Sequence, residues 1–279
     1  AKQAGGNRFS FYSSDMNDGL KRHLTLKHAI KQLLERKAFF PIFQPVVDLQ
    51  SRQVVFMEAL LRWPESDVLE IGVEQLVSFC ETSGLIQHIG QSIFHQALEQ
   101  VVPLRQRFGP QVRVGVNLSI RQLEDPAFRN AVLHLSPAGA YEMLVVEITE
   151  SLLMEQRGRA LEVLEAFRQK GAWLAIDDFG KGYSSLGRLE EIRPDIIKID
   201  GNLLPRGDDD RMRQGFCEAI TVMAQGMNAR VVAEGIETVS QLAFVQGLGC
   251  DYGQGYLFAR PGRLEHLLRE TGKIVTEGR

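Results

Sequence analysis

The sequence WLAIDDFGKGYSS, residues 173–185, begins with an apolar run typical of a β-strand. The run ends at two adjacent carboxylates, Asp177 and Asp178, and a glycine-rich turn follows. Because like charges side by side repel each other, two carboxylates at a strand end usually need a cation between them. Asp and Gly are also ordinary turn residues, so a solvated turn explains this stretch equally well. The rest of the chain has to decide between a cation site and a turn.

On both sides of residues 173–185, strand-like runs alternate with helical patterns. The runs are 39–47, 53–63, 112–117 and 144–150 before this stretch, and 195–200, 230–237 and 249–258 after it. About eight strands at this length predict an α/β fold of the closed (β/α)8 TIM type. Only residues 48–52 join the first two runs, which is too short for a parallel crossover, so the first strand should be antiparallel. Its prolines, Pro41 and Pro45, indicate an edge or irregular strand. The alternative is a doubly wound open sheet, which predicts a glycine-rich phosphate loop after the first strand, and the sequence has none there.

Composition limits the possible partners. The chain has 279 residues, 44% of them hydrophobic, and a net charge of −3, so it can bury a large core and has no excess charge for a nucleic-acid polymer or a membrane surface. Its three cysteines, Cys80, Cys217 and Cys250, are far apart and odd in number, which predicts buried thiols in a reducing, cytoplasmic compartment. No run is long enough to span a membrane. The start at Ala1 predicts a piece of a longer protein, which could be anchored elsewhere.

Polar residues end or directly follow most of the predicted strands. They are Glu58, Asn117, Glu147, Asp177, Lys198, Glu234 and Gln254, with Asp178 next to Asp177. In a barrel all of them point at one mouth. Oxygen ligands without Cys or His favour Mg²⁺ or Mn²⁺, and this set suffices for two ions bridged by Asp177. Two such ions suit in-line displacement at phosphorus, in which Lys198 would hold the attacking water or neutralise developing charge. One buried Glu would be a satisfied core residue, but seven polar strand ends favour a site.

The run Glu58-Ala59-Leu60, followed by Leu61-Arg62-Trp63, resembles the signature of the EAL-domain family, the phosphodiesterases of cyclic di-GMP. Further motifs resemble those of the family in the same order: Phe43–Leu49, Asn117–Ser119, Glu147–Glu150, Asp177–Gly180, Lys198–Asp200, Ala233–Glu237 and Gln254–Tyr256. The resemblance extends from about Phe39 to Pro261. It implies a (β/α)8 barrel with an antiparallel first strand.

The resemblance also implies an activity, the hydrolysis of cyclic di-GMP to linear pGpG with two divalent cations, Mg²⁺ or Mn²⁺. The implied ligands are Glu58, Asn117, Glu147 and Asp177 for the first ion, and Asp177 and Asp178 for the second, with Glu234 as ligand or base. Lys198 would bind the nucleophilic water, Gln254 and Glu237 would orient it, and Glu150 would anchor the loop 179–185, which the family uses to link metal binding to dimerisation. The implied substrate contacts are Gln44, Leu60, Arg62 through phosphate, and Asp200 and Phe258 near a guanine.

Two positions depart from the family pattern. Lys181 stands where the family usually has a small residue, and Gly201 stands where a basic residue is common. Residues 1–12 resemble the tail of a GGDEF (diguanylate cyclase) domain. We therefore expect a linker or tail over 1–15 and an EAL barrel over 16–279, as a homodimer behind an upstream GGDEF or sensor domain.

Two other functions remain open at this point. The first is a silent receptor for cyclic di-GMP, although such receptors usually lose acidic site residues that this chain keeps. The second is an unrelated barrel enzyme that acts on a phosphorylated small molecule, against which the ordered motifs argue.

Overall fold

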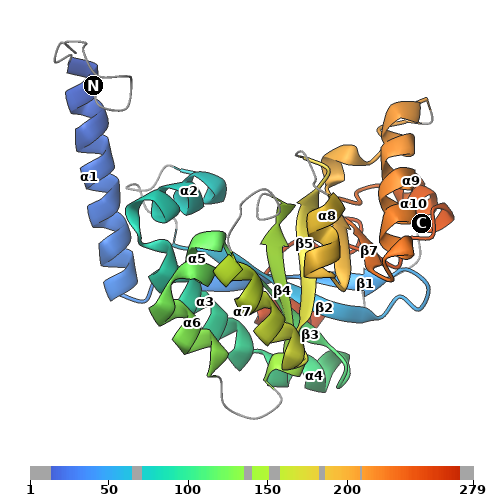
Figure 1. Ribbon diagram of the computed structural model, residues 1–279, viewed down its shortest axis with the longest axis horizontal. Coiled ribbons are helices and arrows are strands. Elements are labelled where there is room, and N and C mark those ends of the chain that lie inside the picture. The colour runs from blue at the N-terminus through green and yellow to red at the C-terminus, as the bar shows by residue number, and fades with distance from the viewer. Residues whose placement is uncertain are drawn as a thin grey trace.

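The computed structural model is a closed barrel of eight strands in the order β1 to β8, with helices around it (Figure 1). It describes residues 14–64, 71–134, 140–150, 158–181, 186–207 and 209–270. The strands are β1 (Phe40–Asp48), β2 (Val54–Arg62), β3 (Arg113–Asn117), β4 (Leu144–Thr149), β5 (Trp173–Phe179), β6 (Ile196–Ile199), β7 (Arg230–Ala233) and β8 (Tyr252–Gly253). The fold predicted from the strand count is therefore confirmed.

The helices fill the connections between strands. They are α1 (Ser14–Glu35), α2 (Val73–Ser83), α3 (Ile86–Glu99), α4 (Val101–Phe108), α5 (Ile120–Glu124), α6 (Pro126–Leu133), α7 (Gly158–Gln169), α8 (Leu186–Ile192), α9 (Arg211–Gly226), α10 (Val239–Gly247) and α11 (Leu264–Glu270), with 3₁₀ turns η2 (Tyr141–Met143) and η4 (Gly201–Leu203). In Figure 1, α1 projects away from the barrel at the left. In the described part of the chain, no helix combines the length and apolar character needed to cross a membrane.

The first strand is antiparallel to both of its neighbours, β2 and β8, while the remaining neighbours pair in parallel. The prediction of an antiparallel first strand is confirmed. The alternative of an edge strand is wrong, because barrel closure pairs β1 on both sides. The strand is irregular, with a register shift between Val46 and Val47. Its prolines are tolerated because the ladder with β8 covers only Val47 and Asp48, which leaves Pro41 and Pro45 outside it.

The barrel interior is built in layers. A layer of fully buried side chains comprises Val46, Phe56, Val145, Ala175, Ile196 and Val232, one from each of six strands. Side chains on a strand alternate between its two faces, so the residues two positions further toward the mouth face the same interior. These residues are Gln44, Glu58, Glu147, Asp177, Lys198 and Glu234. The polar site is thus the next layer of an otherwise apolar barrel core.

The ends of three strands differ from those that the sequence predicted. Glu58 lies in the middle of β2, not at its end as predicted, because β2 continues to Arg62. Conversely, β7 and β8 are shorter than the apolar runs that predicted them, and Glu234 and Gln254 follow directly after their last residues. Both situations bring the side chains to the same mouth. The three cysteines are buried and free of disulfides, as expected for thiols in the core.

Candidate active site

Lys198 stands at the centre of the polar layer, and its side chain is completely buried. Its Nζ atom lies 2.5 Å from a carboxylate oxygen of Glu147, 2.7 Å from Glu234, 3.0 Å from Asp177 and 3.3 Å from Glu58. A buried ammonium is costly unless it is paired, and here three strands and the residue directly after a fourth each supply a partner. Burial alone would lower the pKa of Lys198, but the charges of these carboxylates outweigh it and raise the pKa well above its usual value. Lys198 therefore remains a cation.

The carboxylates outnumber the positive charge they surround. Burial raises the pKa of Glu147 well above its usual range, and the charge of Glu58 raises it further. Burial likewise raises the pKa of Glu234 to about 8, although Lys198 opposes this shift. These shifts mean that one ammonium group does not compensate the negative charge of the cluster. The cluster has the electrostatic character of a site for additional cations.

The acidic oxygens form two groups, each with its ligand atoms within 4.8 Å of one another. One group is Glu58, Glu147 and Asp177, and the other is Asp177, Asp178 and Glu234. Asp177 belongs to both. The Oε1 atom of Glu147 is buried and has no hydrogen-bond partner among the described residues, so it is available to bind a cation. A set of hard oxygen donors with an unpaired buried member fits a divalent cation such as Mg²⁺ or Mn²⁺.

A β-bulge brings the adjacent aspartates Asp177 and Asp178 to the same side. The register between β5 and β6 shifts between Ile176 and Phe179, so that β5 holds one more residue than β6 over this interval. In a regular strand two successive side chains would point to opposite faces. Asp178 instead adopts a left-handed backbone with φ 56°, a conformation that Asp tolerates better than most residues. The bulge explains why both carboxylates join one acidic group.

An amide network holds Glu58 from the opposite side. Asn117 donates from its Nδ2 atom to Glu58 Oε1 at 2.8 Å. Gln254 donates to Glu58 Oε2 at 2.7 Å and to the side-chain oxygen of Gln44 at 3.2 Å. Gln44 in turn donates to the carbonyl oxygen of Ala259 at 3.1 Å. The predicted residues Gln44, Asn117 and Gln254 thus fix the orientation of the Glu58 carboxylate.

A glycine makes room for the deepest carboxylate. A Cβ atom at Gly115 would lie 2.1 Å from Glu147 Oε1 and 3.2 Å from the ring of Phe56. Close packing also requires glycine at position 201, because a Cβ atom there would lie 2.9 Å from the Cα atom of Gly235. Close backbone packing therefore accounts for glycine at the position where the family often has a basic residue.

The segment after β5 is attached to the site at two points. Glu150 accepts a hydrogen bond from the backbone N–H of Gly180 at 2.9 Å, a contact suited to an anchor of this segment. Lys181 lies 2.6 Å from both Asp178 and Asp200. Burial lowers the pKa of Lys181, but the hydrogen bonds to these aspartates raise it more strongly. Residues 182–185 of the predicted loop lie outside the described residues.

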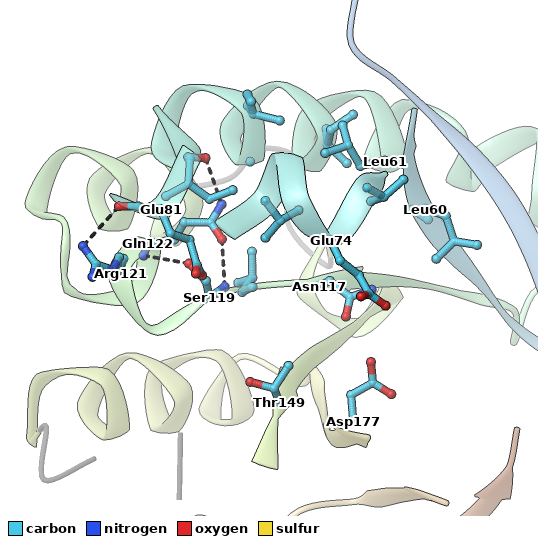
Figure 2. Close-up of a pocket in the computed structure, with 18 of the residues that line it drawn as sticks. Leu60, Leu61, Glu74, Glu81, Asn117, Ser119, Arg121, Gln122, Thr149 and Asp177 are labelled. Carbon is cyan, nitrogen blue, oxygen red and sulfur yellow. Dashed lines mark hydrogen bonds between the residues drawn. The ribbon is translucent and has the colours of Figure 1, made fainter. Parts of the chain in front are cut away.

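Two cavities meet at Asp177, which lines both of them. Asp177 is one of the carboxylates of the polar layer, Glu58, Glu147, Asp177 and Glu234, which we call the acidic layer. A polar cavity of about 720 Å³ is lined by predicted site residues, namely Gln44, Glu58, Asp177, Asp200, Glu234, Glu237 and Gln254. A more apolar cavity of about 410 Å³ extends toward α2 and α3, and its lining includes Leu60, Arg62, Asn117, Asp177 and Asp178. Figure 2 shows the second cavity, with the carboxylate of Asp177 pointing toward Asn117 at one end. Glu237 is exposed, whereas Phe258 packs in the main core.

The sequence reasoning missed the wall of the apolar cavity. Ser119 and Gln122 form a capping box at the start of α5, and Gln122 also donates to the carbonyl oxygen of Ile86 at 3.3 Å (Figure 2). The spacing Ser-x-x-Gln directly after Asn117 is a recognisable signal of this cap. The apolar side chains of α2 and α3 that complete the wall gave only an ordinary amphipathic pattern.

Comparisons with known proteins agree with this geometry. The model of the EAL domain family matches residues 27–261. The cyclic di-GMP phosphodiesterase PdeR of Escherichia coli (strain K12) is 34% identical over 263 residues, which cover 94% of this chain and 40% of PdeR. The bifunctional diguanylate cyclase/cyclic di-GMP phosphodiesterase MucR of Pseudomonas aeruginosa is 34% identical over 274 residues, which cover 96% of this chain and 39% of MucR. This chain therefore spans about two fifths of the length of these relatives.

A solved structure of a related phosphodiesterase shares the fold of this chain. The structure of the PaMucR phosphodiesterase in complex with c-di-GMP superposes with a TM-score of 0.78 at 33% identity, over 87% of this chain and 99% of that chain. The similarity therefore extends over almost the whole of that domain.

Proposed function

Because the chain belongs to the EAL-domain family, we propose that it hydrolyses one phosphodiester bond of cyclic di-GMP to give linear pGpG, which lowers the level of this bacterial second messenger. The observation that carries the proposal is the acidic layer around Lys198, with Asp177 shared by two groups of three carboxylates. Burying several carboxylates at one point is costly to a fold, which supports a function for them. The solved structure of the PaMucR phosphodiesterase is a complex with c-di-GMP, which supports cyclic di-GMP as the substrate.

We assign the cation ligands by their grouping. Glu58, Glu147 and Asp177, with the side-chain oxygen of Asn117, would hold one divalent ion, and Asp177, Asp178 and Glu234 would hold a second. When bound, Mg²⁺ or Mn²⁺ ions would supply the Lewis-acid chemistry that stabilises the attacking and leaving oxygens at phosphorus. Asn117 and Gln254 keep the Glu58 carboxylate turned toward this position through their hydrogen bonds.

The chain's own residues would position the water and move its proton. Lys198 is a buried cation held in place by four carboxylates, so it would hold the attacking water and stabilise negative charge. Glu234, 2.7 Å from Lys198, would accept the proton that this water loses, provided that bound cations keep its carboxylate ionised. Gln254 lies beside Glu58, and its Oε1 atom has no hydrogen-bond partner among the described residues. That oxygen can accept a hydrogen bond from the water, while Glu237 lines the same cavity.

The product defines the bond that breaks. Linear pGpG carries its phosphate at the 5′ end, so water attacks phosphorus and the bond to the 3′ oxygen breaks. The two cavities meet at Asp177, an arrangement that suits a substrate with two guanosine halves joined by phosphates. Arg62 would contact a phosphate of the substrate, and Leu60 would pack against the substrate in the same cavity. From the polar cavity Gln44 would contact the dinucleotide, and Asp200 would lie near a guanine.

We further propose that the domain acts as a homodimer. Three large apolar side chains of α9, Met212, Phe216 and Val222, are 69%, 49% and 62% exposed. Such exposure on one helix supports a contact with a second copy. An upstream GGDEF or sensor domain, preceding a barrel over 16–279, would fit the greater length of the relatives. Light scattering of the purified protein tests the dimer.

Turnover of cyclic di-GMP tests the proposed reaction directly. We expect conversion to pGpG with Mg²⁺ or Mn²⁺, followed by chromatography of the nucleotides, and no turnover by Glu58→Ala, which loses a ligand oxygen. Near-normal rates of Glu58→Ala would reject its role in cation binding. Tight binding of cyclic di-GMP by well-folded protein, without hydrolysis, would instead identify the chain as a receptor.

A further inference from the structure

Lys181 occupies a position set by three contacts. Its ammonium group lies 2.6 Å from Asp178 Oδ1 and 2.6 Å from Asp200 Oδ2. Its backbone N–H donates to the carbonyl oxygen of Asp178 at 3.3 Å, so residues 178–181 form a turn that folds the side chain back. The preceding N–H, that of Gly180, is held by Glu150. The turn and its anchor direct a positive charge onto Asp178.

Asp178 is also one of the three carboxylates that would hold the second divalent ion. We propose that Lys181 is a built-in cation that competes with this second ion for Asp178, so that the two ion sites of the chain differ strongly in affinity. This inference rests on the proposed function, because it takes the acidic layer to be a two-ion site. It assigns a role to the residue at which this chain departs from the family pattern.

Asp200 makes the competition effective. The side chain of Lys181 is 48% exposed and that of Asp178 is 39% exposed, so a pair between these two alone would exchange readily with solvent. The side chain of Asp200 is only 8% exposed, and it also accepts the N–H of Asn202 at 2.7 Å. Asp200 would therefore keep the ammonium group of Lys181 close to Asp178 even when a divalent ion binds there, and the ammonium would repel that ion. Part of the electrostatic attraction at the second site is cancelled before the ion arrives.

The effect is confined to one of the two sites. Lys198 contacts carboxylates of both groups, so it does not distinguish them. The ion pairs of Lys181 in the described structure go to Asp178, which belongs to the second group alone, and to Asp200. Replacing Lys181 should therefore leave the affinity for the first ion almost unchanged. This asymmetry distinguishes competition at Asp178 from a general change in the charge of the domain.

The test measures ion binding rather than turnover. Metal-free protein is titrated with Mn²⁺, and the free ion is followed by electron paramagnetic resonance for the wild type, Lys181→Met, Lys181→Arg and the charge control Lys31→Met, an exposed position on α1. Removal of one charge next to a partly screened divalent ion should tighten the second binding step about tenfold in Lys181→Met and change the first by less than about twofold. Lys181→Arg keeps the charge and should stay within about threefold of the wild type. Lys31→Met should match the wild type.

The Mn²⁺ titration separates a failure of the inference about Lys181 from a failure of the proposed function. If the wild type and Lys181→Met both bind two ions with the same two affinities, the inference about Lys181 is wrong and the proposed function stands. If Lys181→Met binds the second ion more weakly, Lys181 supports the site and the inference is also wrong. If neither protein binds Mn²⁺, the two-ion site and the proposed function fail together with it.

Discussion

Glu234 should make the metal-free fold less stable as the pH rises. Burial raises its pKa from 4.5 to about 8, so between these values the folded protein keeps a proton that the unfolded chain releases. The folded state then binds more protons than the unfolded state, and the free energy of unfolding falls as the pH rises. Each pH unit in this window costs about 1.4 kcal/mol. From pH 5 to pH 8 Glu234 therefore accounts for a loss of at most about 4 kcal/mol.

The assay is urea unfolding in the presence of EDTA, followed by circular dichroism at pH 5, 6.5 and 8. Glu234→Gln cannot ionise, so the variant should gain stability relative to the wild type between pH 5 and pH 8. Glu237→Gln is the matched control, because Glu237 is an exposed glutamate in the same cavity, and it should follow the wild type. Excess Mg²⁺ should abolish the wild-type loss, since the ion binds the ionised carboxylate. A raised pKa at Glu234 is excluded if the wild type and Glu234→Gln depend on pH in the same way, or if the wild type gains stability relative to Glu234→Gln as the pH rises.

Three substitutions test other parts of the site. Gly115→Ala would push a Cβ atom to 2.1 Å from Glu147, so we expect a loss of about 1–3 kcal/mol in urea unfolding and weaker Mn²⁺ binding; an unchanged protein would mean that Glu147 relocates freely. Lys198→Ala should reduce kcat by orders of magnitude while the protein still binds Mn²⁺ at least as tightly as the wild type, because a cation paired with four of the ligands is removed. A rise in KM alone would make Lys198 a substrate contact. Arg62→Ala should raise KM for cyclic di-GMP about tenfold or more, and an unchanged KM would exclude the phosphate contact.

The barrel could be predicted from the sequence because its signals are local. Alternating runs gave the number of strands, and the short connection at residues 48–52 gave the antiparallel start. The pairing of β1 with β8 had no local signal of its own, because β8 comprises only Tyr252 and Gly253. Two residues carry no periodic pattern. Closure is a property of the whole sheet, and the prolines of β1 indicated only the irregularity.

The candidate site was predictable in its residue types but not in its contacts. Polar residues after apolar runs identified the acidic layer, and the alternation of strand side chains explains why that pattern succeeds. The ion pair of Lys181 with Asp200 joins residues on different strand ends, so no spacing in the sequence announces it. The wall of the apolar cavity was missed for a similar reason, because helix side chains that line a cavity follow the same periodicity as side chains that fill a core.

The bulge in β5 links the fold to the proposed chemistry. Regular alternation allows each strand to contribute one side chain to the polar layer, so six strands supply one residue each. A second group of three carboxylates requires an additional acid close to Asp177, and the extra residue between Ile176 and Phe179 supplies it from the same strand. Asp177 can then belong to both groups because its neighbour has rotated toward the mouth. The backbone at Asp178, with its positive φ, is therefore as necessary for the two proposed ion sites as the carboxylate that it carries.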